Sequence, residues 1–247
     1  MTLAAEEVKA CCAAAYSSAA ARFLLGDCFH PGGVALTSQL ALALRVGEGD
    51  LVVDVACGPG TSALQLARET GCAVIGVDLA PPLDPPEDPR VRFIAGDAEA
   101  LPLTDASVDG ALCECALCTF PDKEAAAREL ARVLRPGARL AISDLTARTS
   151  ELPESLTSVQ AWVACIADAR PLDEIVALLA EAGLVVEQVE AHDDALAILL
   201  DRIDGRLVVA SMIGAEGVER GRELVAEARS VLGQGLLGYG VVIARRP

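Results

Sequence analysis

A glycine-rich segment at residues 54–60, with the sequence DVACGPG, is the first part of the chain suited to chemistry. Glycine lets a backbone turn sharply and approach a ligand closely. The segment follows a short apolar run, and ligands of open α/β sheets bind outside the carboxyl ends of such strands. It lacks the Gly-Lys-Ser/Thr ending of a Walker loop and is not a complete Gly-x-Gly-x-x-Gly motif. This glycine loop indicates a ligand site without identifying the ligand.

Two acidic residues follow the next two apolar runs. Asp78 ends the segment Val74–Asp78, and Asp97 comes two residues after the run Val91–Ala95. An acid at the end of a second strand can accept both hydroxyls of a ribose, as it does in dinucleotide-binding folds. One acid at a strand end is often only a solvated side chain. A glycine loop followed by two such acids in this order favours a functional site.

Over residues 48–145 the chain resembles the class I S-adenosylmethionine-dependent methyltransferases, in the glycine loop, Val77-Asp78, the segment 96–98 (GDA) and the segment 134–137 (LRPG). The resemblance implies S-adenosylmethionine as cofactor, with the glycine loop beside its methionine part, Asp78 at the ribose and Asp97 at the adenine amine. Methyl transfer is an in-line displacement, so we expect the protein mainly to position the reactants and exclude water. The cofactor-binding residues expected are Asp54, Ala56, Cys57, Gly58, Gly60, Asp78, Leu79, Asp97, Ala98 and Glu114.

The chain has nine cysteines, a high count for 247 residues. We expect no disulfides, because the sequence shows no secretory signal. Cys113, Cys115 and Cys118 lack a Cys-x-x-Cys partner elsewhere, which argues against a four-ligand structural zinc site. Cys57 and Cys72 are predicted to be packing residues, and Cys113 a core residue.

The segment 114–123 (ECALCTFPDK) resembles the part of arsenite methyltransferases in which a substrate-binding cysteine, here Cys115, precedes a Pro-Asp-Lys helix start. Cys165, in CIADA, is similar to that family's cysteine in the insertion after strand five. Cys28 lies where the family has an upstream cysteine. The resemblance implies that these three thiolates hold As(III) as substrate. Arsenic is soft and suits thiolates, and its free lone pair would attack the methyl group without a general base.

Two other functions remain open. Methylation of an ordinary organic acceptor would require a base, and Glu114 and His30 are the candidates. A non-catalytic metalloid-binding protein is the third possibility, although the intact glycine loop and both acids argue against it. The number of methyl groups added and the oligomeric state stay open. The same holds for substrate binding by Cys11, Cys12, Cys113 and Cys118.

The elements that must position these residues alternate between strands and helices. This alternation predicts a Rossmann-like α/β fold, a mostly parallel seven-stranded sheet covered on both faces. The last strand arrives late, so we expect it to run antiparallel beside the strand before it. The predicted strands are 51–56, 72–77, 91–95, 108–114, 140–144, 184–189 and 236–244. The predicted helices are 1–25, 35–46, 61–70, 122–134, 155–167, 171–182, 194–212 and 216–232.

The length of the chain suits a single methyltransferase domain over residues 1–247. We divide it into an N-terminal helical cap (1–46), a cofactor-binding core (47–147), a helical insertion after strand five (148–182) and a C-terminal part of sheet and helices (183–247).

Composition and net charge limit the classes of molecule that the protein is expected to bind. The chain is 53% hydrophobic and carries a net charge of −16. Such a charge repels nucleic acid and anionic membranes, and suits a small neutral or cationic molecule. The N-terminus has no basic flank or long apolar core, so we expect no signal peptide and a cytoplasmic protein.

Overall fold

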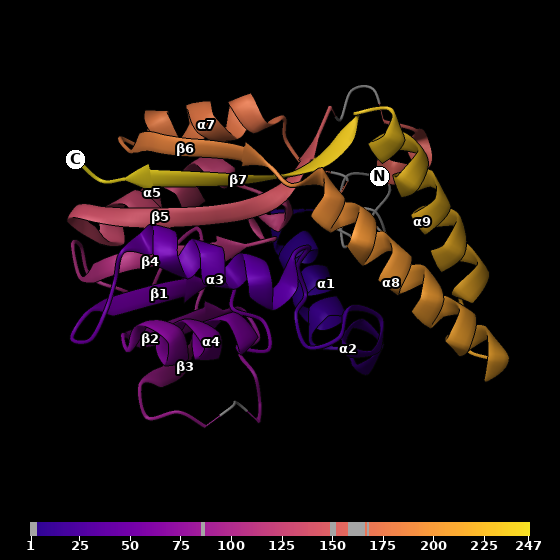
Figure 1. The fold of residues 1–247 in the computed structure, drawn as a ribbon, viewed down its shortest axis with the longest axis horizontal. Helices are drawn as coiled ribbons and strands as arrows, with labels where there is room; N and C mark the ends of the chain where they lie inside the picture. The colour runs from indigo at the N-terminus through magenta and orange to yellow at the C-terminus, as the bar shows by residue number, and fades with distance from the viewer. Residues whose placement is uncertain (1–3, 85–86, 149–151, 158–165, 167) are drawn as a thin grey trace.

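The computed structural model describes residues 4–84, 87–148, 152–157, 166 and 168–247. Its strands are β1 (Leu51–Val55), β2 (Ala73–Asp78), β3 (Val91–Ala95), β4 (Val108–Glu114), β5 (Leu134–Ala147), β6 (Val185–Ala191) and β7 (Leu237–Arg245). They form a seven-stranded sheet in the order β3-β2-β1-β4-β5-β7-β6 (Figure 1). The pairings from β3 to β5 are parallel, and β7 is antiparallel to both β5 and β6. The expected Rossmann-like fold, with its antiparallel last strand, is confirmed.

The helices that cover the faces of the sheet are α3 (Gly33–Leu44), α4 (Thr61–Thr70), α5 (Lys123–Val133) and α7 (Leu172–Glu181). Side chains of α3 and α4 share a core with Val52 and Val74. Those of α5 and α7 share a second core with Val53 and Ile75. Successive strand residues point to opposite faces of the sheet. Each apolar run of the sequence therefore contributes side chains to both cores.

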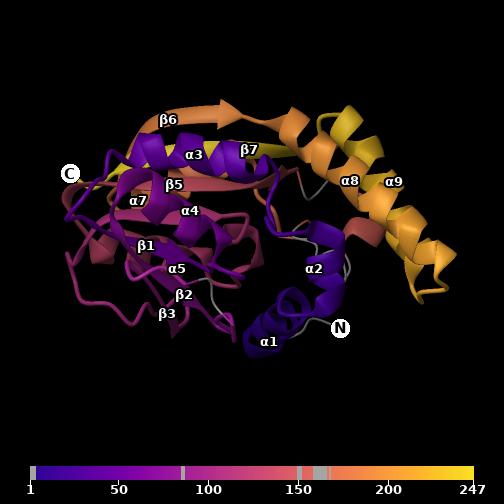
Figure 2. The ribbon, with the colours of Figure 1, turned by 60° about the horizontal axis from the view of Figure 1, so that its bottom comes forward.

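The remaining long helices lie at one end of the sheet. They are α1 (Ala5–Tyr16), α2 (Ala19–Leu25), α8 (Asp193–Met212) and α9 (Val218–Gly233). The pair α8 and α9 projects away from the sheet in both ribbon views, and α2 packs against α8 (Figure 2). None of the helices in the described part of the chain combines the length and apolar character needed to cross a bilayer.

Three elements differ from the sequence expectation. The helix expected over 1–25 is two helices, because the Ser18 side chain accepts a hydrogen bond from the Ala21 amide and starts α2 anew. β5 begins at Leu134 rather than at residue 140, since the Arg-Pro-Gly turn expected to close the preceding helix is part of the strand. The helix expected over 155–167 falls largely outside the described residues, and Glu154–Thr157 form a 3-10 turn.

Candidate functional site

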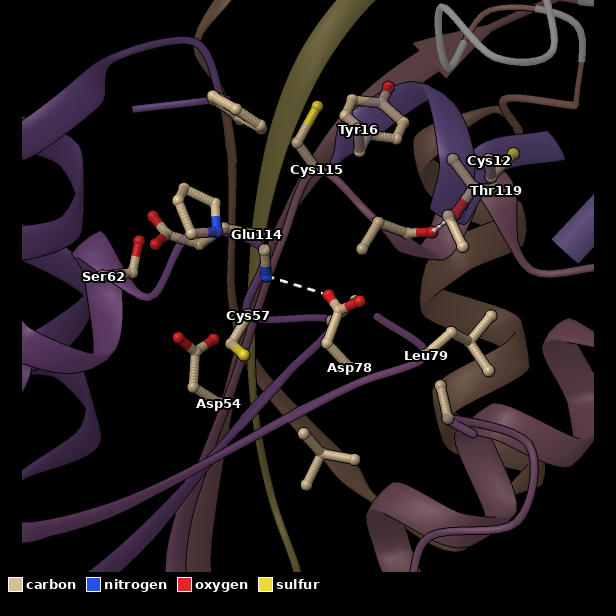
Figure 3. A pocket seen from close by; sticks show the side chains of 18 of the residues that line it. Cys12, Tyr16, Asp54, Cys57, Ser62, Asp78, Leu79, Glu114, Cys115 and Thr119 are labelled. Atoms are coloured by element: carbon tan, nitrogen blue, oxygen red, sulfur yellow. Dashed lines mark hydrogen bonds between the residues drawn. The ribbon is translucent and has the colours of Figure 1, made fainter. Parts of the chain in front are cut away.

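The main pocket opens where β1, β2 and β4 end, and residues of α1 form its other wall (Figure 3). It has about 1030 Å³ of empty space, part of which is open to solvent. The predicted site residues that line it are Cys28, Asp54, Ala56, Cys57, Gly58, Asp78, Leu79, Asp97, Ala98, Glu114 and Cys115. Segments far apart in the sequence therefore share one cavity, as the carboxyl ends of parallel strands should.

The glycine loop turns tightly because three of its residues have left-handed backbone angles. These are Ala56, Gly58 and Gly60, with φ of 57°, 51° and 81°. The Gly58 amide donates to Asp78 Oδ2 at 2.9 Å, so the first two strand ends are joined directly. Gly60 does not line the pocket. A Cβ there would lie 2.4 Å from the Phe93 ring, so packing requires glycine at this position.

Three carboxylates come together at the carboxyl ends of the strands (Figure 3). Asp54 is 2% exposed, and its Oδ2 has no hydrogen-bond partner among the described residues. Glu114 accepts from Thr37 Oγ1 at 3.1 and 3.2 Å, and His30 Nε2 lies 3.6 Å from its Oε2. Burial, with the nearby charges of Glu114 and Asp78, raises the pKa of Asp54 well above its usual value. The strand-end part of the pocket thus holds three carboxyl groups, and the surrounding protein compensates their ionisation only in part.

Asp97 lies at another part of the pocket and already has a cationic partner. Lys9 Nζ, from α1, is 2.7 Å from Asp97 Oδ2 and 2.5 Å from Glu99 Oε2. Burial by itself would lower the pKa of Lys9, but the hydrogen bonds to these two carboxylates raise it to about 12. The expected adenine-binding acid is therefore also the point at which the N-terminal helix is tied to the core.

Two of the three predicted substrate cysteines lie in this pocket. Cys28 and Cys115 line it, whereas Cys165 falls outside the described residues. Burial and the Glu114 charge raise the pKa of the Cys28 thiol. Cys115 has a left-handed φ of 53°, an uncommon angle for a side-chain-bearing residue, and its amide donates to the Ser143 carbonyl at 2.6 Å.

The other cysteines divide between core, surface and pocket. Cys72 and Cys113 are completely buried, and burial raises the pKa of both thiols. Cys118 is also a core residue, and Cys11 is exposed. Cys57, expected both in the cofactor site and in packing, lines the pocket at 7% exposure, and burial raises the pKa of its thiol. Among the described residues, no group of three or more His, Cys, Asp or Glu side chains is arranged to hold a metal ion.

One wall of the pocket was anticipated from the sequence only at Cys12, whose part in substrate binding the sequence leaves open. Lys9, Cys12, Ala13 and Tyr16 of α1 all line the cavity. Their spacing of three, four and seven residues places them on a single helical face, which is the signal that could have identified them. Tyr16 also faces Phe29, with ring centroids 6.2 Å apart. α1 therefore contributes a thiol and an aromatic ring to the site, as well as the Lys9 ion pairs.

Comparison with known proteins agrees with this geometry. A family model described as a methyltransferase domain matches residues 53–142. Methyltransferase GfsG of Streptomyces halstedii is 34% identical over 216 residues, which cover 80% of this chain and 75% of that protein. The chain belongs to the class I S-adenosylmethionine-dependent methyltransferases. This methyltransferase is also similar to an arsenite methyltransferase of Halobacterium salinarum, 29% identical over 185 residues that cover 69% of this chain but 47% of that protein.

The methyltransferase is also similar to a fungal O-methyltransferase in sequence and to solved methyltransferases in fold. O-methyltransferase resE of Aspergillus sclerotiorum is 28% identical over 225 residues, covering 85% of this chain and 81% of that protein. Among solved structures, Haemonchus contortus phosphoethanolamine N-methyltransferase 2 with S-adenosylhomocysteine has a TM-score of 0.77 at 18% identity, covering 92% of this chain and 56% of that one. This structural likeness supports the fold. The methyltransferase uses S-adenosylmethionine as its cofactor.

The pocket of the methyltransferase fits this cofactor on its own chemistry. S-adenosylmethionine supplies an electrophilic methyl group and carries positive charge on its sulfonium and its ammonium. The unpartnered Oδ2 of Asp54 is a buried acceptor that a cationic group would satisfy. The exposed backbone of the glycine loop allows close approach, because a Cβ at Gly58 would meet no atom closer than 4.0 Å.

Proposed function

We propose that this methyltransferase transfers methyl to a small acceptor bound through the thiols of Cys28 and Cys115, and that trivalent arsenic is this acceptor. One observation carries the proposal. Cys28 and Cys115, from segments far apart in the sequence, line the same pocket as the glycine loop and Asp78. Thiols are soft donors, and As(III) is a soft centre that prefers them over oxygen ligands.

These thiols can bind arsenite without a general base to remove their protons. Each As–S bond forms as a thiol proton and an arsenite hydroxyl leave together as water. The raised pKa of Cys28 is therefore no obstacle, because the free thiol needs no prior ionisation for this exchange. Coordination by sulfur leaves the arsenic lone pair available for the methyl group. A third sulfur ligand comes from a thiol in solution or from Cys165.

The cofactor would be held by the residues around the glycine loop. In this proposal Asp54 and Glu114 offset the positive charge of the methionine end, and Asp78 accepts from the ribose hydroxyls. Asp97 accepts from the adenine amine. Lys9, by tying α1 to Asp97, would keep the pocket covered and so exclude water from the reaction.

The test uses labelled S-adenosylmethionine, arsenite and excess thiol with the full chain, and measures methylated arsenic. We expect Cys28→Ser and Cys115→Ser each to lower the rate at least about tenfold, because each removes a soft ligand. Cys72→Ala is the matched control, since Cys72 is buried outside the pocket. Methylation at the wild-type rate by the Cys28→Ser/Cys115→Ser variant would exclude thiol-bound arsenic.

A hydroxyl acceptor is the second candidate, and the contact between His30 and Glu114 favours it. His30 Nδ1 lies 3.1 Å from the Pro31 carbonyl, so donation there leaves Nε2 able to take a proton. Nε2 in turn lies 3.6 Å from Glu114 Oε2, so a carboxylate faces the nitrogen that would take the proton. The same assay with a panel of phenols separates the candidates. His30→Gln should abolish methylation of a phenol and leave methylation of arsenite unchanged.

A further inference from the structure

The negative charge of the pocket is distributed unevenly. Lys9 neutralises the end that contains Asp97 and Glu99. In the described part of the chain, Asp54, Asp78 and Glu114 form no ion pair with a lysine or arginine, and the basic side chain beside Glu114 is His30, 3.6 Å away. The strand-end part of the pocket therefore keeps an excess of negative charge.

Two of these three carboxylates have partners that explain their place without a ligand. Asp78 accepts from the Gly58 amide at 2.9 Å and from the Ala80 amide at 2.8 Å. Glu114 accepts from Thr37. Asp54 is 2% exposed and its carboxyl group accepts from the Ala63 amide, but its Oδ2 accepts no hydrogen bond among the described residues. A buried carboxylate oxygen without a partner is costly, so it points to a cationic group that completes the site when bound.

We infer that Asp54, Asp78 and Glu114 make this methyltransferase bind S-adenosylmethionine in preference to S-adenosylhomocysteine. The preference comes from the attraction between these carboxylates and the positive charge of the sulfonium, which S-adenosylhomocysteine lacks. S-adenosylmethionine has a sulfonium, an ammonium and a carboxylate, and so a net charge of about +1 at neutral pH. Loss of the methyl group turns the sulfonium into a neutral thioether. The product then has no net charge, whereas the three carboxylates are unchanged.

The consequence is assisted release of the product. Before transfer, the positive sulfur offsets the excess negative charge of the pocket. After transfer, the same carboxylates face a ligand without net charge, and the positive charge that offset part of their negative charge is gone. Burial strengthens this effect, because charges that are shielded from water interact more strongly than exposed ones. The inference concerns the cofactor only, and it holds whether the acceptor is arsenic or a hydroxyl.

The test is a set of binding measurements by calorimetry on the full chain, without any acceptor. The ligands are S-adenosylmethionine, S-adenosylhomocysteine and sinefungin, in which a protonated amine replaces the sulfonium. We expect both cationic ligands to bind about tenfold or more tightly than S-adenosylhomocysteine, as one added charge pair in a shielded site allows. Sinefungin separates the effect of charge from that of the methyl group, which it lacks.

Substitutions identify the residues responsible. Asp54→Asn and Glu114→Gln should each reduce the preference for the cationic ligands several-fold, mainly by weakening their binding. Asp173→Asn is the matched control, because it removes an equal charge from an exposed position on α7, outside the pocket. Equal affinity of the wild-type protein for all three ligands would overturn the inference. So would variants that weaken the cationic ligands and S-adenosylhomocysteine by the same factor.

Discussion

Asp54 lies at the end of β1, 2% exposed, with one carboxylate oxygen that accepts no hydrogen bond among the described residues. Ionisation of such a group is unfavourable for the folded protein and favourable for binding a cation. Proteins commonly accept this kind of local cost at functional sites, and replacing the residue then improves stability while it impairs function. In the proposed cofactor site, Asp54 is thus a residue at which folding and ligand binding are opposed.

The first prediction concerns Asp54→Asn and pH. The pKa of Asp54 is raised above its ordinary value of 3.8, so the folded protein holds this proton more firmly than the unfolded chain does. The resulting stabilisation is complete below pH 3.8 and is lost as pH rises through the folded-state pKa. At neutral pH the cofactor-free Asn variant should therefore be more stable, with a melting temperature higher by about 2–4 °C per kcal/mol gained.

Differential scanning calorimetry across pH checks this prediction. The difference in melting temperature between variant and wild type should be small in acid and should grow as pH rises. Saturating S-adenosylmethionine should stabilise the wild type more than the variant. A variant less stable than the wild type at neutral pH would show that Asp54 is satisfied in the ligand-free protein.

At the scale of elements, the connection between β4 and α5 depends on a buried lysine. Lys123 Nζ donates to the carbonyl oxygens of Cys118 and Phe120 at 3.3 and 2.9 Å, and to Asp168 Oδ2 at 2.5 Å. A cation in the first turn of a helix opposes the helix dipole, so these acceptors must offset an unfavourable position. The connection carries Cys115, and Lys123 joins it to the segment that follows strand five.

The second prediction compares Lys123→Met with Lys123→Met/Asp168→Asn. The single substitution should destabilise the protein by about 3 kcal/mol, because it leaves Asp168 partly buried with Arg170, at 3.4 Å, as its remaining ion-pair partner among the described residues. The double variant should recover part of this loss, since the uncompensated charge is gone. Urea unfolding of both variants measures these free energies. Additive losses in the double variant would show that the two side chains are not coupled.

The same two variants separate stability from positioning. In both, the carbonyls of Cys118 and Phe120 lack the lysine donor, so the Michaelis constant for the acceptor should stay raised even where stability recovers. The affinity for S-adenosylmethionine should stay close to that of the wild type. Recovery of the acceptor constant in the double variant would assign Lys123 a purely structural role.

At the scale of the molecule, the N-terminal helices close the pocket from outside the sheet. α1 contributes Cys12 and Tyr16 to its lining, and Lys9 links α1 to the loop after β3. α2 packs on α8, where Arg206 donates to the Leu24 carbonyl at 2.7 Å. The cover is thus held at both ends, by ion pairs on one side and by helix packing on the other.

The third prediction is that Lys9→Met speeds cofactor dissociation. Loss of the two ion pairs leaves α1 with fewer links to the core, and lids that open faster release ligands faster. We expect the dissociation rate of S-adenosylmethionine, measured by stopped flow, to rise about tenfold, the change that a loss of roughly 1.4 kcal/mol produces. Arg220→Met, in an exposed ion pair on α9, is the control. An unchanged dissociation rate would show that α1 does not limit release.

Much of the fold could be predicted from the sequence, and so could many residues that line the candidate pocket, because their signals are local. Each apolar run lies within a few residues of its own signal, which is the glycine loop, Asp78 or Asp97. The rule that parallel strands share a carboxyl edge then brings these segments together. The predicted seven strands and the antiparallel last strand are confirmed, so local periodicity largely decides such a sheet, whereas the strand order comes from the structure.

Only the tertiary structure decided which side chains surround the carboxyl edge of the sheet. Lys9 and Asp97 are 88 positions apart, and nothing near either residue indicates their pairing. The unpartnered oxygen of Asp54 follows from the packing of several elements and has no trace in the local sequence. Sequence patterns report the periodicity of single elements, whereas charge compensation and burial depend on which distant elements meet. The sequence by itself therefore determined the sheet and its glycine loop, and only the packed chain decided how the pocket is covered and charged.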